Sequence, residues 1–225
     1  MVFRLPDFVR NSDETLADSV MSSKLARFLS YIFHPLLMPF YAVILVMNLN
    51  TYIAYSISPQ VQRIIISLVF ITTGAMPVIT ALLLLQKGAI RSMEMESIEE
   101  RRIPFITTAV YYLSCYYLLQ QLPIPRILGL MVLGATVTIF IAWLLSFRWK
   151  VSIHMIGIGG FTGLLFAISQ ILGAPLLPAI ILIILISGVL GSSRLILNAH
   201  TPAQVYSGFL IGLFTEWWLI TWLSR

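Results

Sequence analysis

The architecture of this chain is indicated by the stretch Arg148–Leu172, RWKVSIHMIGIGGFTGLLFAISQIL, in which a short basic loop leads into a long apolar run. From Ile153 onward the run contains no Lys, Arg, Asp or Glu, and about 20 such residues suffice to cross a bilayer as a helix. The stretch therefore predicts a membrane-spanning helix. Close packing against a neighbouring helix explains its glycines better than a nucleotide-binding loop does: Gly157, Gly159, Gly160 and Gly163.

The composition of the whole chain points the same way. Of 225 residues, 59% are hydrophobic and 10% are charged, and the mean hydropathy is +0.93, which is more apolar surface than a soluble domain can hide. We predict an all-α, polytopic membrane helix bundle of six to seven transmembrane helices, with an interfacial N-terminal segment at 1–27 and a single membrane domain at 28–225. The candidate spans are Tyr31–Ile57 (interrupted by Pro35 and Pro39), Arg63–Gln86, Pro104–Leu122, Ile127–Phe147, Ile153–Leu172, Leu176–Leu190 and Ala203–Leu223.

The polar segments between these spans fall on one side of the predicted bundle. Two spans separate the charged loop Lys87–Ile103 from the loop Arg148–Ser152, and two more separate that loop from Gly191–Pro202. All 14 Lys and Arg residues lie on this side except three, and by the positive-inside rule the crowded side is cytoplasmic. We therefore expect an integral, multi-pass protein of a bacterial inner membrane. The three exceptions are Arg63, Arg126 and Arg225.

The last polar segment, GSSRLILNAHTPAQVYSG at Gly191–Gly208, carries an arginine and a histidine between two apolar runs. Thr201-Pro202 predicts a helix start, with Gln204 at the capping-box position. The N–H groups of a helix start favour an anion, and Arg194 offers a planar fork that suits phosphate. Arg194 and His200 form either a phosphate site or a plain helix cap with a snorkelling arginine, and we favour the phosphate site.

A second histidine lies on the same predicted side. His154 opens the fifth span, and Ser152 and Lys150 precede it closely. Two imidazoles on one face permit a division of labour, in which one attacks phosphorus and the other protonates the leaving oxygen. Cations around them would neutralise the oxygens of the transferring phosphoryl group.

These residues resemble two motifs of the type 2 phosphatidic acid phosphatase family. Ser193-Arg194, five residues and His200 match its third motif, which is Ser-Arg, five residues, His, three residues and Asp. Val151-Ser152-Ile153-His154 resembles its second motif, Pro-Ser-Gly-His, and the resemblance covers about Ile127–Leu223 as a phosphatase-like core. It implies metal-independent hydrolysis of a lipid phosphate through a phosphohistidine, with His200 as the nucleophile and His154 as the acid for the leaving group. Arg194 and Ser152 would bind the phosphate.

The chain departs from the family pattern at two places. Gln204 stands where the third motif has Asp; an amide accepts a hydrogen bond from imidazole but carries no charge to stabilise an imidazolium, so we expect weak turnover or substitution by a loop carboxylate. The first motif, Lys, six residues and Arg-Pro, is absent as written. In its place we put Lys150 and Arg102 first as phosphate-binding cations, followed by Arg101 and Arg148. The carboxylates that could replace the motif Asp are Glu94, Glu96, Glu99 and Glu100.

Three further residues lie outside these motifs. His34, in FHPLLMPF, is interpreted as a structural residue at a proline-broken helix end rather than a catalyst. Glu216 falls in the last span, where an ionisable group suggests function, although the neighbouring tryptophans fit an interfacial position equally well. Cys115 is the single cysteine, so an intramolecular disulfide is impossible, and we expect no metal site.

The sequence therefore leads us to expect a membrane lipid phosphate phosphatase. Its substrate would be a lipid phosphomonoester or diphosphate of the phosphatidate, phosphatidylglycerophosphate or polyprenyl diphosphate type. We expect no cofactor, no nucleic acid partner, and contact only with the lipid phosphate and the surrounding membrane lipids. The alternatives are a catalytically weak or inactive family member that binds or transports lipid phosphates, and an enzyme that transfers phosphate between lipids.

Overall fold

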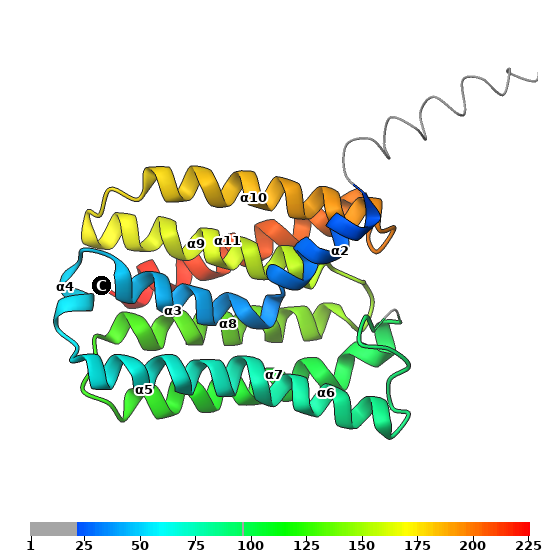
Figure 1. Ribbon diagram of the computed structural model, residues 1–225, viewed down its shortest axis with the longest axis horizontal. Coiled ribbons are helices and arrows are strands. Elements are labelled where there is room, and N and C mark those ends of the chain that lie inside the picture. The colour runs from blue at the N-terminus through cyan, green and yellow to red at the C-terminus, as the bar shows by residue number, and fades with distance from the viewer. Residues whose placement is uncertain (1–21, 96) are drawn as a thin grey trace, which may run out of the picture.

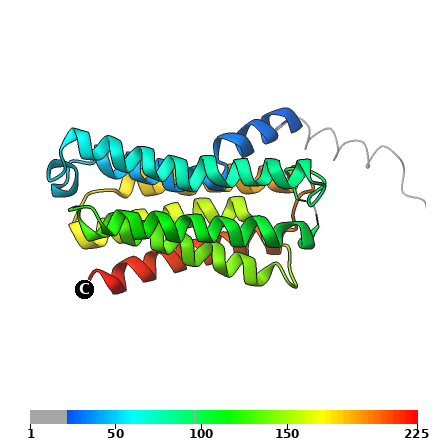
Figure 2. The same ribbon diagram turned by 90° about the horizontal axis from the view of Figure 1, so that it is seen from below.

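The computed structural model describes residues 22–95 and 97–225, and every regular element in these ranges is a helix. The long helices lie side by side along the longest axis of the molecule (Figures 1 and 2). This arrangement confirms the predicted all-α bundle. The elements are α2 Ser23–Ile32, η1 Pro35–Leu37, α3 Met38–Asn48, α4 Tyr52–Tyr55, α5 Pro59–Val69, the π-helical η2 Phe70–Ala75, α6 Met76–Gln86, α7 Ile98–Gln120, α8 Arg126–Leu145, α9 Ile153–Leu172, α10 Leu177–Ile196 and α11 Pro202–Leu223.

Five helical segments of the described chain are long and apolar enough to cross a membrane. Their length and composition support the prediction of a helical membrane protein. The helices α7 and α11, with 23 and 22 residues, are longer than three of these segments but less apolar, because α7 is rich in tyrosine and α11 in tryptophan. The five segments are Ser23–Asn48, Pro59–Gln86, Arg126–Leu145, Ile153–Leu172 and Leu177–Ile196.

The first segment differs from the predicted span Tyr31–Ile57. It starts at Ser23, ends at Asn48 and is broken into α2, η1 and α3. The break follows from Pro35 and Pro39, which lack the N–H that a continuous helix requires. Residues 1–21 of the predicted interfacial segment lie outside the described residues, and 23–27 belong to α2.

The loops that precede α7, α9 and α11 meet at one end of the bundle, where α2 also packs against α10 (Figure 1). Arg101, in the first turn of α7, donates from Nη1 to the carbonyl oxygen of Val151 at 3.1 Å. Nδ1 of His200, just before α11, lies 3.3 Å from the carbonyl oxygen of Lys150. These contacts confirm that the three polar segments share one side.

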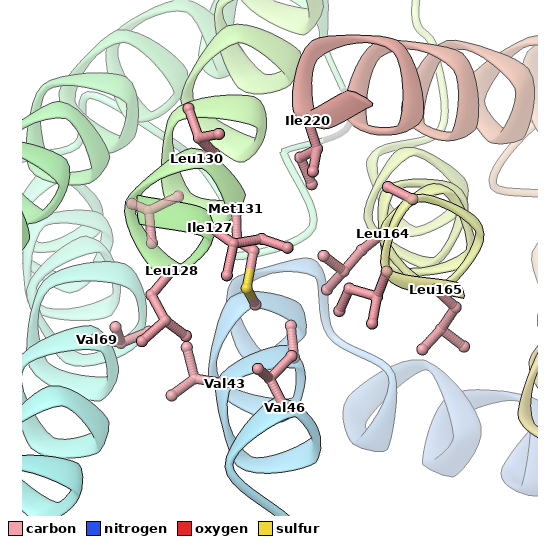
Figure 3. Close-up of a cluster of buried hydrophobic side chains, with 14 of the residues drawn as sticks. Val43, Val46, Val69, Ile127, Leu128, Leu130, Met131, Leu164, Leu165 and Ile220 are labelled. Atoms are coloured by element: carbon pink, nitrogen blue, oxygen red, sulfur yellow. The ribbon is translucent and has the colours of Figure 1, made fainter. Parts of the chain in front are cut away.

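Aliphatic side chains from α3, α5, α8, α9 and α11 fill the interior (Figure 3). Val43, Leu128 and Leu165, from three different helices, are each at most 1% exposed. The core therefore packs the N-terminal helices against the C-terminal ones, and these packed helices carry the loops at the polar end of the bundle.

The closest helix pair is α9 with α11, and glycines make the approach possible. A Cβ on Gly163 would collide with the carbonyl oxygen of Leu213, and one on Gly212 would collide with that of Ile156. Gly159 and Gly208 face the partner backbone in the same way. The glycine-rich run is thus a packing surface, as the sequence predicted, because no side chain fits between the two backbones.

Adding one methyl group at this contact tests its role. We expect Gly212→Ala to lower the free energy of unfolding by about 1–3 kcal/mol, because the carbonyl of Ile156 has to move away. Thermal unfolding in detergent measures the change. The matched control is Gly188→Ala on α10, where a Cβ meets nothing within 4 Å, and this variant should be unchanged or slightly more stable. Equal losses in the two variants would contradict the close packing.

Candidate functional site

The candidate site is built around His200, which sits in the turn between α10 and α11 and is 8% exposed. Its Nδ1 lies 3.1 Å from Oε1 of Gln204 and 3.3 Å from the carbonyl oxygen of Lys150. Both partners are acceptors, so Nδ1 carries the ring proton and Nε2 holds the free lone pair. The surroundings of His200 thus select the tautomer in which Nε2 carries no proton.

Gln204 makes two contacts, one that caps α11 and one with His200. Its Oε1 accepts the backbone N–H of Thr201 at 3.2 Å, which is the capping-box contact, and the same oxygen accepts the Nδ1 proton of His200. The N–H of Thr201 requires an acceptor, so it also decides which end of the amide faces the histidine. The same amide therefore caps the helix and orients the imidazole of His200.

Arg194 and His154 are joined through Ser30 of α2. Arg194 donates from Nη1 to Oγ of Ser30 at 3.1 Å, and Nε2 of His154 lies 3.2 Å from the carbonyl oxygen of the same residue. A carbonyl can only accept, so Nε2 of His154 carries its proton and Nδ1 holds the lone pair. Ser30 is buried and was missed by the sequence reasoning, since nothing near it in the chain points to the site.

Three buried polar atoms of this cluster have no partner among the described residues. They are Nε of Arg194, Oγ of Ser152 and Nδ1 of His154. Buried polar groups in folded proteins are nearly always hydrogen-bonded, and each exception calls for an explanation such as a missing ligand. An arginine N–H and a serine O–H are two donors, and together with a helix start they suit an oxyanion.

The electrostatics of the cluster also favour an anion. Burial is the main reason that the pKa of His200 falls from 6.5 to about 4. The positive charges of Arg101, Arg194 and Lys150 lower it further, whereas the hydrogen bond to the Gln204 amide raises it. Arg194 also acts electrostatically on His154. A bound anion would offset these charges.

The predicted phosphate-binding arginines differ in their position relative to His200. Arg101 is 4% exposed and bonds to the backbone of the α8–α9 loop, so it lies beside His200. Arg102 instead covers the ring of Phe147, with its guanidinium carbon 4.7 Å from the ring centroid, and Arg148 is exposed. The structure therefore brings Arg101, and not Arg102, next to His200, because consecutive residues on a helix point about 100° apart.

The loop glutamates do not replace the motif carboxylate in the part of the chain that is described. Glu100 faces Arg91, with 3.9 Å between Oε1 and Nε, and Glu94 acts electrostatically on Arg194. Glu99 is exposed, and Glu96 lies outside the described residues. The position beside His200 is held by Gln204 and a backbone carbonyl, so the imidazole has no carboxylate partner.

An apolar cavity of about 180 Å³ lies in the bundle next to this cluster; Arg101 lines it, whereas His154, Arg194 and His200 do not. His34, Glu94 and Arg101 form its polar end, and apolar side chains of α3, α6, α7, α8 and α9 form most of its walls. The cavity gives the polar cluster an apolar extension inside the bundle, which suits an amphipathic ligand.

Glu216 of α11 lines the same cavity, roughly 18 Å along the helix from Gln204. It is 4% exposed and has no hydrogen bond or ion pair among the described residues. Its carboxyl group occupies the space that a Cβ on Gly134 would need. The structure therefore places Glu216 in the interior of the bundle, facing the cavity.

Comparisons of the chain with known protein families, with curated proteins and with solved structures find no match. The geometry of the site thus carries the functional reasoning that follows.

The hydrogen bonds of His200 predict its protonation behaviour. We expect ¹⁵N NMR to show a neutral ring with the proton on Nδ1 above about pH 5, and a titration midpoint at about 4, because burial and the neighbouring cations disfavour the imidazolium. Gln204→Asp should move the midpoint upward, because a carboxylate stabilises the imidazolium. A midpoint near 6.5 or a proton on Nε2 would contradict the arrangement.

Proposed function

We propose that the protein is a metal-independent phosphatase that hydrolyses a lipid phosphomonoester or diphosphate through a phosphohistidine on His200. The observation that carries the proposal is the tautomer of His200. Its Nδ1–H donates to Oε1 of Gln204 and to the carbonyl oxygen of Lys150, so its Nε2 has a free lone pair. This nitrogen belongs to a cluster that contains unpartnered donors on Arg194 and Ser152. A fixed nucleophile beside anion-binding groups is what phosphoryl transfer requires.

In the first half of the reaction Nε2 of His200 attacks phosphorus, so that a P–N bond forms and the P–O bond to the lipid breaks. A substrate that binds as the phosphate monoanion brings one proton, which the free Nδ1 of His154 takes up and passes to the leaving oxygen, while its Nε2–H stays bonded to Ser30. In the second half water attacks phosphorus, His154 takes the proton of the water, and the P–N bond breaks. Arg194, Ser152 and the neighbouring cations Lys150 and Arg101 stabilise the charge on the phosphoryl oxygens.

The membrane setting favours a lipid as the substrate. The polar cluster lies at the end of a bundle with five apolar spans, and the cavity beneath it can hold part of a hydrocarbon chain. We further propose that α7 and α11 also cross, which gives seven transmembrane helices. The excess of Lys and Arg at the site end supports a cytoplasmic position of the site in a bacterial inner membrane.

The resemblance to the type 2 phosphatidic acid phosphatase family supports the same chemistry through Ser193-Arg194, His200 and the Ser152–His154 pair. Gln204 favours a second candidate function. With an uncharged partner for His200 the chain would bind or transport a lipid phosphate with little turnover, because an amide stabilises the developing imidazolium less than a carboxylate does.

Phosphate release tests the enzymatic role directly. Purified protein is given phosphatidate, phosphatidylglycerophosphate and a polyprenyl diphosphate in detergent with a chelator present. We expect release by the unchanged protein, a loss of about 10³-fold or more in His200→Gln, and a loss of about 10²–10⁴-fold in His154→Gln. Arg63→Gln, at the opposite end of the bundle, is the control and should be unchanged. No release from any of these lipids between about pH 5 and 8 would exclude the enzyme.

Gln204→Asp distinguishes an attenuated enzyme from a binding protein. A carboxylate at this position would stabilise the imidazolium of His200, so we expect turnover to rise by at least about 10-fold. Gln204→Leu serves as the comparison and should lower turnover, because it removes the acceptor that orients the ring. Binding of lipid phosphate without any gain in Gln204→Asp would instead support the binding or transport function.

A further inference from the structure

His34 lies at the polar end of the cavity, although the sequence had indicated only a structural role for it. Its ring contacts that of His154 edge to face, with 5.5 Å between the ring centroids, and it is close enough to Arg194 for their charges to interact. His34 thus belongs to the same cluster as the two motif histidines, and it reaches this place because the break before Pro35 turns the chain toward α9.

The hydrogen bond that His34 makes decides what it can offer a ligand. As the N-cap of η1, its Nδ1 accepts the backbone N–H of Leu36 at 3.3 Å. Nδ1 therefore holds the lone pair, and the ring proton is on Nε2. This Nε2–H has no partner among the described residues, and the side chain that bears it lines the cavity.

We propose that His34 contacts the substrate as a neutral hydrogen-bond donor, from Nε2–H to the oxygen that links the phosphate to the lipid. The inference rests on the proposed phosphatase function. The phosphate would lie between Arg194 and His200, and the hydrocarbon chain would lie in the cavity. The oxygen that links phosphate and lipid would then lie where the polar cluster meets the cavity, next to His34.

The division of roles between His34 and His154 follows from their bonds. A second proton on Nδ1 of His34 would face the N–H of Leu36, so this ring stays neutral and polarises the bridging oxygen without giving up its proton. His154 has a free Nδ1 and a Nε2–H bonded to a carbonyl, so it can take up and release a proton there. The P–O bond then breaks as His154 delivers the proton and His34 supports the charge that develops on the oxygen.

Two variants separate this role from simple helix capping. In His34→Asn the side-chain oxygen can still accept the N–H of Leu36, but the donor at the Nε2 position is lost. In His34→Gln the amide nitrogen lies near the Nε2 position, but the cap is weakened. For a single-chain glycerol lipid monophosphate we expect His34→Asn to lower kcat/KM by about 10²-fold and His34→Gln to keep more of it.

The leaving group supplies a second readout that a structural role would not move. With p-nitrophenyl phosphate, whose leaving oxygen needs little stabilisation, the loss in His34→Asn should shrink to a few-fold. The proposal is overturned if His34→Asn keeps full activity while His34→Gln loses it, or if the loss in His34→Asn is the same for both substrates. Thermal unfolding of both variants shows whether a loss has a folding cause.

A binding measurement tests the contact even if the protein releases no phosphate. The lipid monophosphate is added to His200→Gln protein, which cannot form the phosphohistidine, and the Nε2–H signal of His34 is followed by NMR. A downfield shift on binding supports the hydrogen bond. Saturable binding without movement of this signal, or no binding at all, overturns it. Absence of release in the unchanged protein would count against the proposed phosphatase alone.

Discussion

The structure depends on the direct contact between the backbones of α9 and α11. Glycines on both helices remove the side chains that would hold them apart, and Gly163 and Gly212 each face a carbonyl oxygen of the partner. Because the helices are this close, their starting ends are also close, and the N–H of Ser152 donates to the carbonyl of Gln204 at 3.2 Å. The two loops that carry His154 and His200 thus share one small space, and the chemistry of the site follows from a packing constraint.

The proline break in the first span brings α2 against the same group of residues, on the side of Arg194 and His154. A continuous helix through Pro35 would leave the cluster without Ser30, which holds Arg194 and His154 through its hydroxyl and carbonyl oxygens. The break also brings His34 against His154. The N-terminal helices therefore do more than add spans, since they supply the groups that orient an arginine and a histidine from the C-terminal half.

Much of this could be predicted from local sequence. Apolar runs indicate membrane spans, Thr201-Pro202 indicates a helix start, and counting spans brings His154 and His200 to one end, which the hydrogen bonds of the described residues confirm. What could not be predicted depends on helix rotation and on contacts between distant segments. Arg101 rather than Arg102 faces the cluster because of the rotation of α7, and Ser30 reaches Arg194 across 164 positions of the chain.

The central claim is that Nε2 of His200 becomes covalently phosphorylated. A rapid acid-free quench of the protein with ³²P-labelled lipid phosphate, followed by mass spectrometry at alkaline pH, measures this directly. The tautomer held by Gln204 and the carbonyl of Lys150 leaves Nε2 with the lone pair, so a phosphoryl group should be found there. With p-nitrophenyl phosphate, whose leaving oxygen needs little help from an acid, the phosphoryl group should accumulate in His154→Gln, because only the hydrolysis step then requires His154. Turnover without label on the protein, or label on a residue other than His200, would contradict the mechanism.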